Sequence, residues 1–590
     1  PPLLILDQNN NKVPLVDLHG KFRPEIGSLA GQYVKNEYYE QGKAPDKSID
    51  VQIAIQLKEE NAAFKVEKYV HSYPNCWRTD KPILFYPLDS WFIKVTEVRD
   101  RLTTLNEDIN WKPKATGEGR FGNWLANAND WNLSRSRFWG IPLPVWRTEE
   151  GKETKVIGSL AELYEEIEKS IEKGHMISNP VSDFEVGDMS DSNYEKVDLH
   201  KHIVDNIVLT SARGTPMHRE KDLIDVWFDS GSMPYAQWHY PFENKDKIDG
   251  RTAFPADYIA EGVDQTRGWF YTLHVISTLV FDSISYKNVV SNGLVLDKNG
   301  QKMSKRLGNA VDPFETIDQY GADAMRWYMI SNANPWDNLK FDLEGIGEVQ
   351  RKFFGTLHNT YSFFSLYANI DGFKNQEATI PLAKRPELDR WILSELNSLI
   401  GKVDSFYEDY EPTKASRAIS EFVQEKLSNW YVRLCRRRFW KGEYQKDKIA
   451  ALQTLWECLL KITQLAAPIA PFYSDRLYQD LIENTVSDKS VSVHLSIFPT
   501  VNGESINTVL ENRINNARNI TSLALSLRKK EQIKVRQPLQ TLMIAVNSPE
   551  EKIEIEKIQE QVRSEINVKS IKLIDHDSNI LLKEIKPNFK

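Results

Sequence analysis

The chain has 590 residues, of which 41% are hydrophobic and 27% charged, and its formal net charge is −8. This composition is typical of a globular protein with several domains of roughly 150 residues each. It excludes a generally basic surface, so a nucleic-acid partner would need a local basic patch. No run of about 18 apolar residues occurs, so we expect no membrane-spanning helix. The three cysteines share no metal-ligand spacing and indicate a reducing cytoplasm.

The first third of the chain predicts small modules. Residues 1–88 combine short alternating segments with turns, which indicates a small α/β or β-rich module. Residues 89–150 are rich in tryptophan. The charged stretch at residues 160–173 has the pattern of a helix, and we place it in a module inserted at about 147–220.

The middle of the chain predicts a parallel sheet. Residues 251–345 alternate apolar runs with helical patterns, as in parallel α/β folds. Val289-Val290 and residues 294–296 have the composition of buried strands, and residues 266–279 have the pattern of a helix. We therefore expect one domain over residues 89–345.

The rest of the chain predicts mainly helices. Amphipathic patterns such as residues 388–403 and 451–465 indicate a helical bundle over residues 346–505. Residues 506–590 begin with a helix, continue with a strand at 542–546 and end in charged helical sequence. The expected fold is a multidomain α/β plus α protein.

The sharpest motif is a loop with two lysines, Lys302-Met303-Ser304-Lys305-Arg306, which we call the signature loop. It follows an expected strand and turn. Lysines on a mobile loop beside a sheet edge can surround a triphosphate and stabilise the charge that grows on its leaving group. Taken alone, a Lys-x-Ser-Lys sequence is more often an exposed basic turn. The surrounding motifs reverse that judgement.

The signature loop resembles the KMSKS loop of class I aminoacyl-tRNA synthetases, with Arg306 in place of the usual final serine. Three further blocks are similar to isoleucyl-tRNA synthetases, and they cover residues 130–142, 222–231 and 261–270. The resemblance extends from about residue 71 to residue 538. Valyl and leucyl relatives share the loop but do not usually carry the Asp-Gln-x-Arg-Gly-Trp-Phe string that begins at Asp264.

The resemblance implies half of a Rossmann-like catalytic domain that activates isoleucine with ATP and Mg²⁺ and transfers it to tRNA(Ile). Lys302 and Lys305 would be catalytic, and Met303 and Ser304 would join Lys305 in binding ATP. Isoleucine and its adenylate would be bound by Glu261, Gly262, Asp264, Gln265, Trp227 and Trp269. For the two tryptophans plain core packing is the alternative, and for Glu261 it is helix N-capping.

A basic, aromatic stretch in the helical region predicts RNA binding. Cations contact phosphates, and rings or guanidinium planes stack on unpaired bases. The candidate residues of this anticodon-binding region are Trp430, Arg433, Arg436, Arg437 and Arg438. The alternative is an amphipathic helix with its aromatic residues in the core and its arginines paired. A second basic run, from Arg528 to Arg536, would continue this surface or be a solvated face.

The sequence also departs from the family. It lacks the HIGH motif, begins at Pro1 and ends at Lys590, so we expect a fragment without activity of its own. Residues 1–88 resemble the tail of the editing insertion, and residues 506–590 the start of a C-terminal tRNA-interacting domain. Zinc is not supported, because the stretches beginning at Cys76 and at Arg147 cannot supply four N or S ligands. Arg306 and the missing cysteines resemble the eukaryote-like subgroup.

Three other interpretations remain open. The chain could be a valyl-tRNA synthetase, or a non-catalytic tRNA-binding derivative of a synthetase. A general nucleotide hydrolase is a third, although the sequence has no Gly-x-x-x-x-Gly-Lys loop. We expect a cytoplasmic monomer with isoleucine, ATP and tRNA as partners and no membrane.

Overall fold

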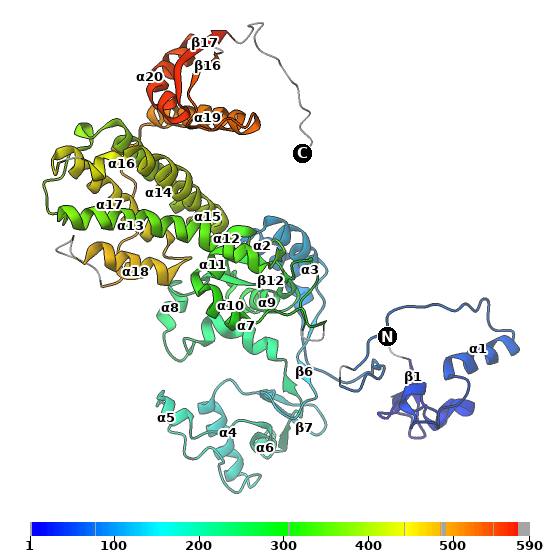
Figure 1. Cartoon of the computed structure of the whole chain (residues 1–590). Coiled ribbons are helices and arrows are strands. Elements are labelled where there is room, and N and C mark those ends of the chain that lie inside the picture. The colour runs from blue at the N-terminus through cyan, green and yellow to red at the C-terminus, as the bar shows by residue number, and fades with distance from the viewer. Residues whose placement is uncertain are drawn as a thin grey trace. The chain divides into compact units, whose positions relative to one another are not determined.

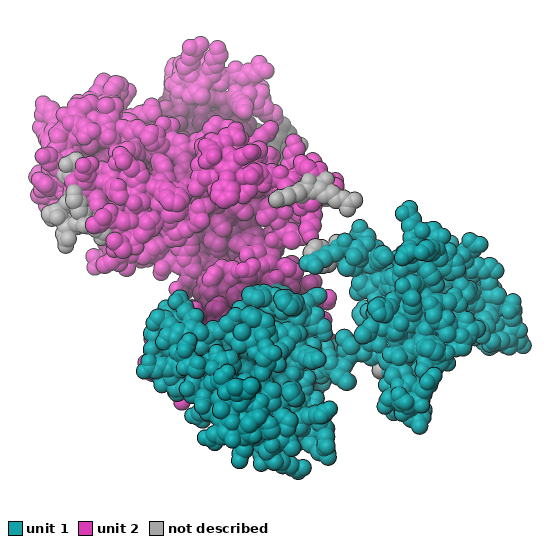
Figure 2. Space-filling model, turned by 90° about the horizontal axis from the view of Figure 1, so that it is seen from below, with its two compact units in different colours: residues 1–97, 129–228 teal, residues 98–128, 229–590 magenta. Residues whose placement is uncertain are grey.

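The computed structural model describes residues 3–76, 78–304, 307–441, 443–483, 485, 491–546 and 548–575. The chain forms two compact units, coloured separately in Figure 2. Unit 1 contains residues 1–97 and 129–228, and unit 2 contains residues 98–128 and 229–590. Among the described residues, no helix has the length and apolar character needed to cross a membrane.

Unit 1 begins with a module of little regular structure. Its elements are the antiparallel strands β1 (Leu4–Leu6) and β2 (Lys12–Pro14), followed by helix α1 (Ile49–Glu59). Two small antiparallel pairs follow, formed by β3 (Phe92–Ile93) with β5 (Trp131–Asn132), and by β6 (Ser134–Arg135) with β11 (Leu223–Ile224).

The second part of unit 1 is a four-stranded antiparallel sheet in the order β8-β7-β10-β9. The helix predicted at residues 160–173 is α4 (Leu160–Glu172), which lies against this sheet, and Ser159 caps its first turn. Trp146 and Ile167 belong to the shared core. The remaining elements are β7 (Val145–Thr148), β8 (Thr154–Val156), α5 (Asp191–Tyr194), α6 (Lys201–Val204), β9 (Val208–Thr210) and β10 (Pro216–Arg219).

Unit 2 contains the parallel sheet that the sequence predicted, with the strand order β12-β13-β4. The strands are β12 (Ala256–Gly262), β13 (Tyr286–Asn292) and β4 (Asn110–Lys112). Helix α9 (Trp269–Phe281) connects β12 to β13, and it is buried along most of its length. The other elements of this region are α2 (Arg99–Asn106), the π-helix η4 (Thr116–Phe121), α3 (Gly122–Ala126), α8 (Lys245–Asp249) and α7 (Val226–Ala236), whose first three residues belong to unit 1.

Two predicted elements of this region were wrong in detail. Residues 263–267 form a 3₁₀ turn, η5, and Gly268 has non-helical φ and ψ of −139° and −114°, so α9 begins three residues later than expected. The buried strand expected at 294–296 is only β14 (Val295–Leu296), and Leu294 and Val295 are exposed. β14 pairs in parallel with the short β15 (Leu339–Lys340), and Leu296 also forms an isolated bridge with Lys302.

A helical bundle follows the sheet, and it confirms the predicted amphipathic helices (Figure 1). Its apolar residues form one core that extends from α11 to the C-terminal module. The helices are α10 (Pro313–Tyr320), α11 (Ala322–Asn332), α12 (Leu343–Val349), η7 (Gln350–Phe354), α13 (Gly355–Asp371), α14 (Glu387–Glu408), α15 (Pro412–Glu421), η9 (Phe422–Val432), α16 (Arg433–Trp440), α17 (Lys446–Ala466) and α18 (Pro471–Ile482).

The C-terminal module packs helix α19 (Thr508–Lys530) against α20 (Pro549–Ile566). α20 also connects the parallel strands β16 (Leu539–Val546) and β17 (Val568–Asp575). β16 contains the predicted strand 542–546. The charged helical sequence expected after this strand is confirmed by α20, but residues 568–575 form β17 instead of a helix. Residues 576–590 lie outside the described residues.

Candidate active site

The two most informative motifs leave the parallel sheet at the same edge. Glu261 pairs with Ser291 and Gly262 with Asn292, which are the last residues of β12 and β13. The 3₁₀ turn follows β12 directly, and the signature loop begins ten residues after the end of β13. The carboxyl edge of a parallel sheet is where ligands bind in open α/β folds.

The segment after β12 presents one acidic group to solvent. Glu261 is exposed, and its carboxylate has no hydrogen-bond or ion-pair partner within the part of the chain that the structure describes. The carboxylate of Asp264 folds back over Gly262, where a Cβ would lie 2.6 Å from Asp264 Oδ1. Gln265 Nε2 donates to Asp264 Oδ2 over 3.1 Å. Gly262 therefore leaves room for the Asp264 side chain.

Gln265 and Trp269 fix the start of α9. Gln265 Oε1 accepts a hydrogen bond from Trp269 N over 3.0 Å, so this side chain caps the helix. Trp269 is half-buried, and its Nε1 donates to Ser230 O over 2.9 Å. Helix α7 approaches α9 closely, since a Cβ on Gly231 would lie 2.8 Å from Ile276 Cδ1. The alternative role weighed for Glu261, helix capping, is performed by Gln265.

Trp227 lies in unit 1, at the start of α7, and its exposed fraction is 39%. The carboxylate of Asp225, which is buried, organises this region. It accepts hydrogen bonds from Trp131 Nε1 over 3.0 Å and pairs with Arg135 at 2.6 Å. Two blocks that carried the family resemblance, 130–142 and 222–231, are therefore neighbours.

The described part of the signature loop is organised by a side chain that sequence reasoning did not select. Asn309 Oδ1 accepts from Ser304 N over 2.9 Å, and Asn309 Nδ2 donates to Lys302 O over 3.3 Å. The same Nδ2 donates to Asp297 Oδ2 over 3.0 Å. Backbone N–H groups, above all that of Gln301, and the Asn309 side chain lower the pKa of the Asp297 carboxyl. In the sequence, the signal that could have identified Asn309 was a polar residue seven positions after Lys302, close to the signature loop.

The loop residues differ in their surroundings. Met303 packs against the core that continues into the helical bundle, and this contact anchors the loop. Ser304 Oγ accepts from Leu307 N over 3.2 Å. Lys302 forms a single bridge with Leu296, and its side chain is exposed. Lys305 and Arg306 lie outside the described residues.

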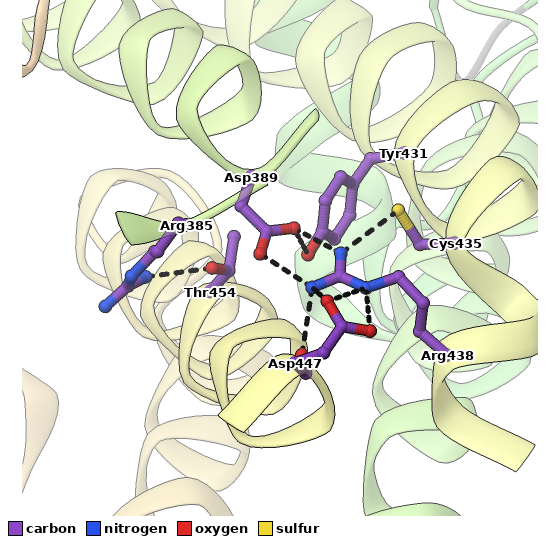
Figure 3. Close-up of polar contacts among 7 residues, drawn as sticks. All are labelled: Arg385, Asp389, Tyr431, Cys435, Arg438, Asp447 and Thr454. Carbon is purple, nitrogen blue, oxygen red and sulfur yellow. Dashed lines mark hydrogen bonds and ion pairs between the residues drawn. The ribbon is translucent and has the colours of Figure 1, made fainter. Parts of the chain in front are cut away.

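The structure corrects two of the five residues proposed to bind RNA. Trp430 is only 4% exposed and belongs to the bundle core, so it cannot stack on a base. Arg438 points into the bundle (Figure 3) and donates to both carboxylate oxygens of Asp389, over 2.6 and 2.9 Å. Of the others, Arg433 pairs with Glu565, while Arg436 and Arg437 are exposed.

Arg438 is the centre of a buried polar network. Tyr431 Oη donates to Asp389 Oδ1 over 2.8 Å, and Arg438 also donates to Asp447 (Figure 3). Burial, followed by the nearby Asp389 charge, raises the pKa of Tyr431 well above its usual value. Burial also raises the pKa of the Cys435 thiol to about 12. This network joins α14, η9, α16 and α17 and is structural.

No group of His, Cys, Asp and Glu among the described residues could hold a metal ion. The Cys76 sulfur is only partly buried, and the Thr79 side chain lowers its pKa. In the stretch beginning at Arg147, the guanidinium pairs with Glu220 at 3.1 Å. These surroundings do not fit a zinc site, which needs four N or S ligands.

Comparisons with known proteins agree with these motifs. The family model for tRNA synthetases class I (I, L, M and V) matches residues 36–342, and the model for the anticodon-binding domain of tRNA ligase matches residues 389–544. The isoleucine–tRNA ligase of Bacteroides fragilis (strain YCH46) is 58% identical over 100% of this chain and 53% of its own length. That of Cytophaga hutchinsonii is 57% identical over 100% and 52%.

A solved methionyl-tRNA synthetase from Mycobacterium tuberculosis, in complex with methionyl-adenylate, is a distant structural neighbour. It is 15% identical, with a TM-score of 0.48 and 73% of each chain covered. The chain spans about half the length of the curated relatives it matches.

Proposed function

This chain belongs to the class I tRNA synthetases of the I, L, M and V group, and we propose that its complete protein is an isoleucine–tRNA ligase. The supporting relatives are 55–58% identical over the whole chain. The observation that carries the proposal is the pairing of Gly262 with Asn292, which brings the adenylate segment and the start of the signature-loop segment to one sheet edge.

The proposed reaction has two steps. The carboxylate of isoleucine attacks the α-phosphate of ATP, the bond to the β-phosphate breaks, and isoleucyl-adenylate and pyrophosphate form. A ribose hydroxyl of the terminal adenosine of tRNA(Ile) then attacks the acyl carbon and releases AMP. The protein contributes mainly alignment and charge stabilisation to the first step.

Each proposed site residue has a role that suits its position. Glu261 would accept hydrogen bonds from the ammonium group of isoleucine or the ribose of the adenylate, because its carboxylate faces solvent at the sheet edge. Lys302 and Lys305 would contact the phosphates, with Met303 and Ser304 shaping the loop. Gly262, Asp264 and Gln265 would form the polar floor, and Gln265 would act through its cap on α9.

Trp227 and Trp269 would form the apolar walls for the isoleucine side chain. An apolar pocket separates isoleucine from valine by one methylene, worth about 1–3 kcal/mol, and isoleucyl-tRNA synthetase is the standard example of this limit. We therefore propose that the complete protein also edits misactivated valine, with the editing centre outside this chain. For RNA binding we retain Arg433, Arg436 and Arg437 as candidates. We further propose that the complete protein is a cytoplasmic monomer.

The test is ATP–pyrophosphate exchange by the complete protein with isoleucine, valine and leucine. Isoleucine should give the highest kcat/KM, and Glu261→Gln should lower it at least about tenfold, as expected for the loss of a charged hydrogen bond. A preference for valine would reject the assignment, and an absence of exchange with any amino acid would favour a non-catalytic tRNA-binding protein. The 590-residue chain alone should show no exchange.

A further inference from the structure

The turn between α14 and α15 contacts two strands of the parallel sheet. Residues 409–411 form this turn, which we call the bundle turn. The ring of Tyr410 stacks on the ring of Tyr258 in β12, with 4.8 Å between the centroids and 6° between the planes. Lys112 Nζ, at the end of β4, lies 2.8 Å from Asp409 Oδ1. In the strand order β12-β13-β4 these are the two outer strands of the described sheet, so one turn joins both.

The bundle turn supports one face of the sheet, and α9 covers the other. The register of the three strands places Tyr258 and Lys112 on the same face, because alternate residues of a strand share a face. Trp111 points to the opposite face, where the centroid of its ring lies 5.9 Å from that of Phe270 in α9. Glu261 follows Tyr258 by three residues in β12, so it belongs to the α9 face. The bundle turn therefore holds the sheet from behind Glu261.

Tyr410 adopts a backbone conformation that bulky side chains rarely take. Its φ is +54°, in the left-handed region, where a Cβ crowds the following carbonyl oxygen. Apart from glycines, most of the other described residues with positive φ are Asn or Asp, which tolerate this region better. A strained residue of this kind persists where its surroundings hold it and its side chain has a function. For Tyr410 the structure shows one such function, the ring contact with Tyr258.

The bundle turn is itself fixed, so it can act as a support. Glu411 N donates to Phe406 O over 2.7 Å, which closes the turn. Glu411 is buried, and its Oε1 lies 3.8 Å from Lys112 Nζ. Directly after the turn, Thr413 Oγ1 donates to Ile330 O over 2.7 Å, which ties α15 to α11. Movement of β12 relative to the bundle would therefore have to break the contact between the two tyrosine rings.

We propose that Tyr410 is a positioning residue for amino-acid activation. It holds Tyr258 in place and so fixes the end of β12, from which Glu261 and Gly262 would meet the substrate. An error of about 1 Å in the placement of reacting groups can lower a rate roughly a hundredfold, so a support behind this strand matters for the reaction. The role in activation rests on the proposed function, whereas the support of β12 by Tyr410 does not.

The test compares Tyr410→Gly with Tyr410→Phe in the complete protein by ATP–pyrophosphate exchange with isoleucine. Glycine removes the ring but suits a positive φ, so the turn should keep its conformation. We expect kcat to fall roughly two- to tenfold, as for the loss of an aromatic pair, while the KM for ATP changes by less than about twofold. Phenylalanine keeps the ring and should preserve kcat, because the stacked contact needs no hydroxyl group.

A double variant tests whether Tyr410 acts through Glu261. In a Glu261→Gln background, Tyr410→Gly should lower kcat further by less than about twofold, because the effects of residues that act as a unit are not additive. A general loss of stability would instead lower kcat by the same factor in both backgrounds.

Gln532→Gly is the matched control for the introduction of glycine. Gln532 also has a positive φ, of 55°, and its side chain is exposed. The substitution therefore relieves the same backbone constraint without removing a ring contact, and kcat should stay unchanged.

Amide hydrogen exchange of β12 gives a measurement that does not depend on the ligase assignment. Residues 259–262 should exchange roughly two- to tenfold faster in Tyr410→Gly, while α14 and α15 keep their rates. Normal kcat in Tyr410→Gly would overturn the positioning role. So would an equal loss in Tyr410→Phe, in Gln532→Gly or in the Glu261→Gln background. If the unaltered protein exchanges pyrophosphate with no amino acid, the proposed function fails, and amide exchange still decides whether Tyr410 supports β12.

Discussion

Asn309 Nδ2 donates to Asp297 Oδ2 over 3.0 Å, and this hydrogen bond closes the base of the signature loop. Asp297 itself accepts hydrogen bonds from the backbone of Asn299 and Gln301, so the acceptor is held in place. Because Asn309 also bonds Ser304 N, one amide sets the path of the chain through the described part of the loop.

Asn309→Ala should slow the proposed adenylate formation. The loop would lose its internal bonds, and the lysines would spend less time near the phosphates. Since a hydrogen bond contributes about 1–2 kcal/mol, we expect kcat for ATP–pyrophosphate exchange in the complete protein to fall roughly five- to thirtyfold. The KM for isoleucine should change little, because Asn309 is a positioning residue for the loop.

Asn299→Ala is the matched control, since the side chain of Asn299 is exposed on the same turn and makes no hydrogen bond among the described residues. It should leave kcat within about twofold. An Asn309→Ala variant with normal kcat, or with an effect confined to the KM for isoleucine, would contradict the assigned role.

Gly117→Ala should destabilise unit 2. Gly117 lies in the π-helix η4, and a Cβ there would lie 2.3 Å from Trp111 Cδ1. Trp111 is a buried residue of β4 whose Nε1 donates to Asn106 Oδ1 over 2.9 Å, so the ring cannot move away freely. Overpacking of this kind costs about 1–3 kcal/mol or more. Hydrogen exchange of β4 and η4 should accelerate accordingly.

Gly119→Ala provides the control within the same π-helix. Apart from its chain neighbours and the backbone of its own helix, no atom of the described residues lies within 4 Å of the position that its Cβ would take. This substitution should be neutral or slightly stabilising, because alanine restricts the unfolded chain more than glycine does. Equal hydrogen-exchange rates in the Gly117→Ala and Gly119→Ala variants would show that a contact between residue 117 and Trp111 does not determine the stability of η4.

Local patterns predicted much of the fold, because they are written in consecutive residues. Periodicity identified α14 and α17, and the run at Val289-Val290 identified β13. The same reasoning failed at residue 294, because burial depends on whether another layer covers a strand. It also placed the start of α9 too early. The helical pattern of the sequence begins before Gly268, but the backbone of Gly268 is not helical, so the helix begins only after it.

In the candidate site, too, some features could be predicted from the sequence and others could not. The motif residues could be selected by resemblance, but the roles of their neighbours depend on distant parts of the chain. Arg438 has its partner Asp389 49 positions away, and Arg528 reaches Asn567 39 positions away. A sequence shows the arginines but not which of them are already paired, so both were first assigned to a surface.

His274 should make the stability of unit 2 depend on pH. This side chain of α9 is fully buried, and burial lowers its pKa to about 4. Its Nε2 donates to Leu102 O over 2.9 Å, which assigns the neutral tautomer, and its Nδ1 is buried without a partner within the described structure. The unfolded chain therefore binds a proton at a higher pH than the folded chain does.

The direction of the pH dependence of stability follows from this difference in the pKa of His274 between the folded and the unfolded chain. Above the unfolded pKa of about 6.5 the histidine contributes no pH dependence, and stability falls as the pH drops from about 6.5 to 4, by at most ~3 kcal/mol. Urea unfolding of His274→Gln should lack this part of the acid dependence. Identical pH profiles for the variant and the original chain would show that the pKa of His274 is the same in the folded and the unfolded chain.

Asp389→Ala should destabilise the helical bundle strongly. Asp389 is 0% exposed, and its loss would leave the Arg438 guanidinium and the Tyr431 hydroxyl with unsatisfied donors. Breaking a buried ion pair from one side costs about 3–5 kcal/mol. Hydrogen exchange of α14 and α16 should therefore accelerate by two orders of magnitude or more, since about 1.4 kcal/mol corresponds to a factor of ten.

Two further variants separate a lost interaction from a lost side chain. Arg437→Met removes an exposed cation from the same helix and should change stability by less than about 0.5 kcal/mol. The double variant Asp389→Leu with Arg438→Met removes both charges and should be more stable than Asp389→Ala, because apolar replacements can compensate for a buried pair. If the double variant were the less stable of the two, the cost would come from the shape of the site rather than from an unpaired charge.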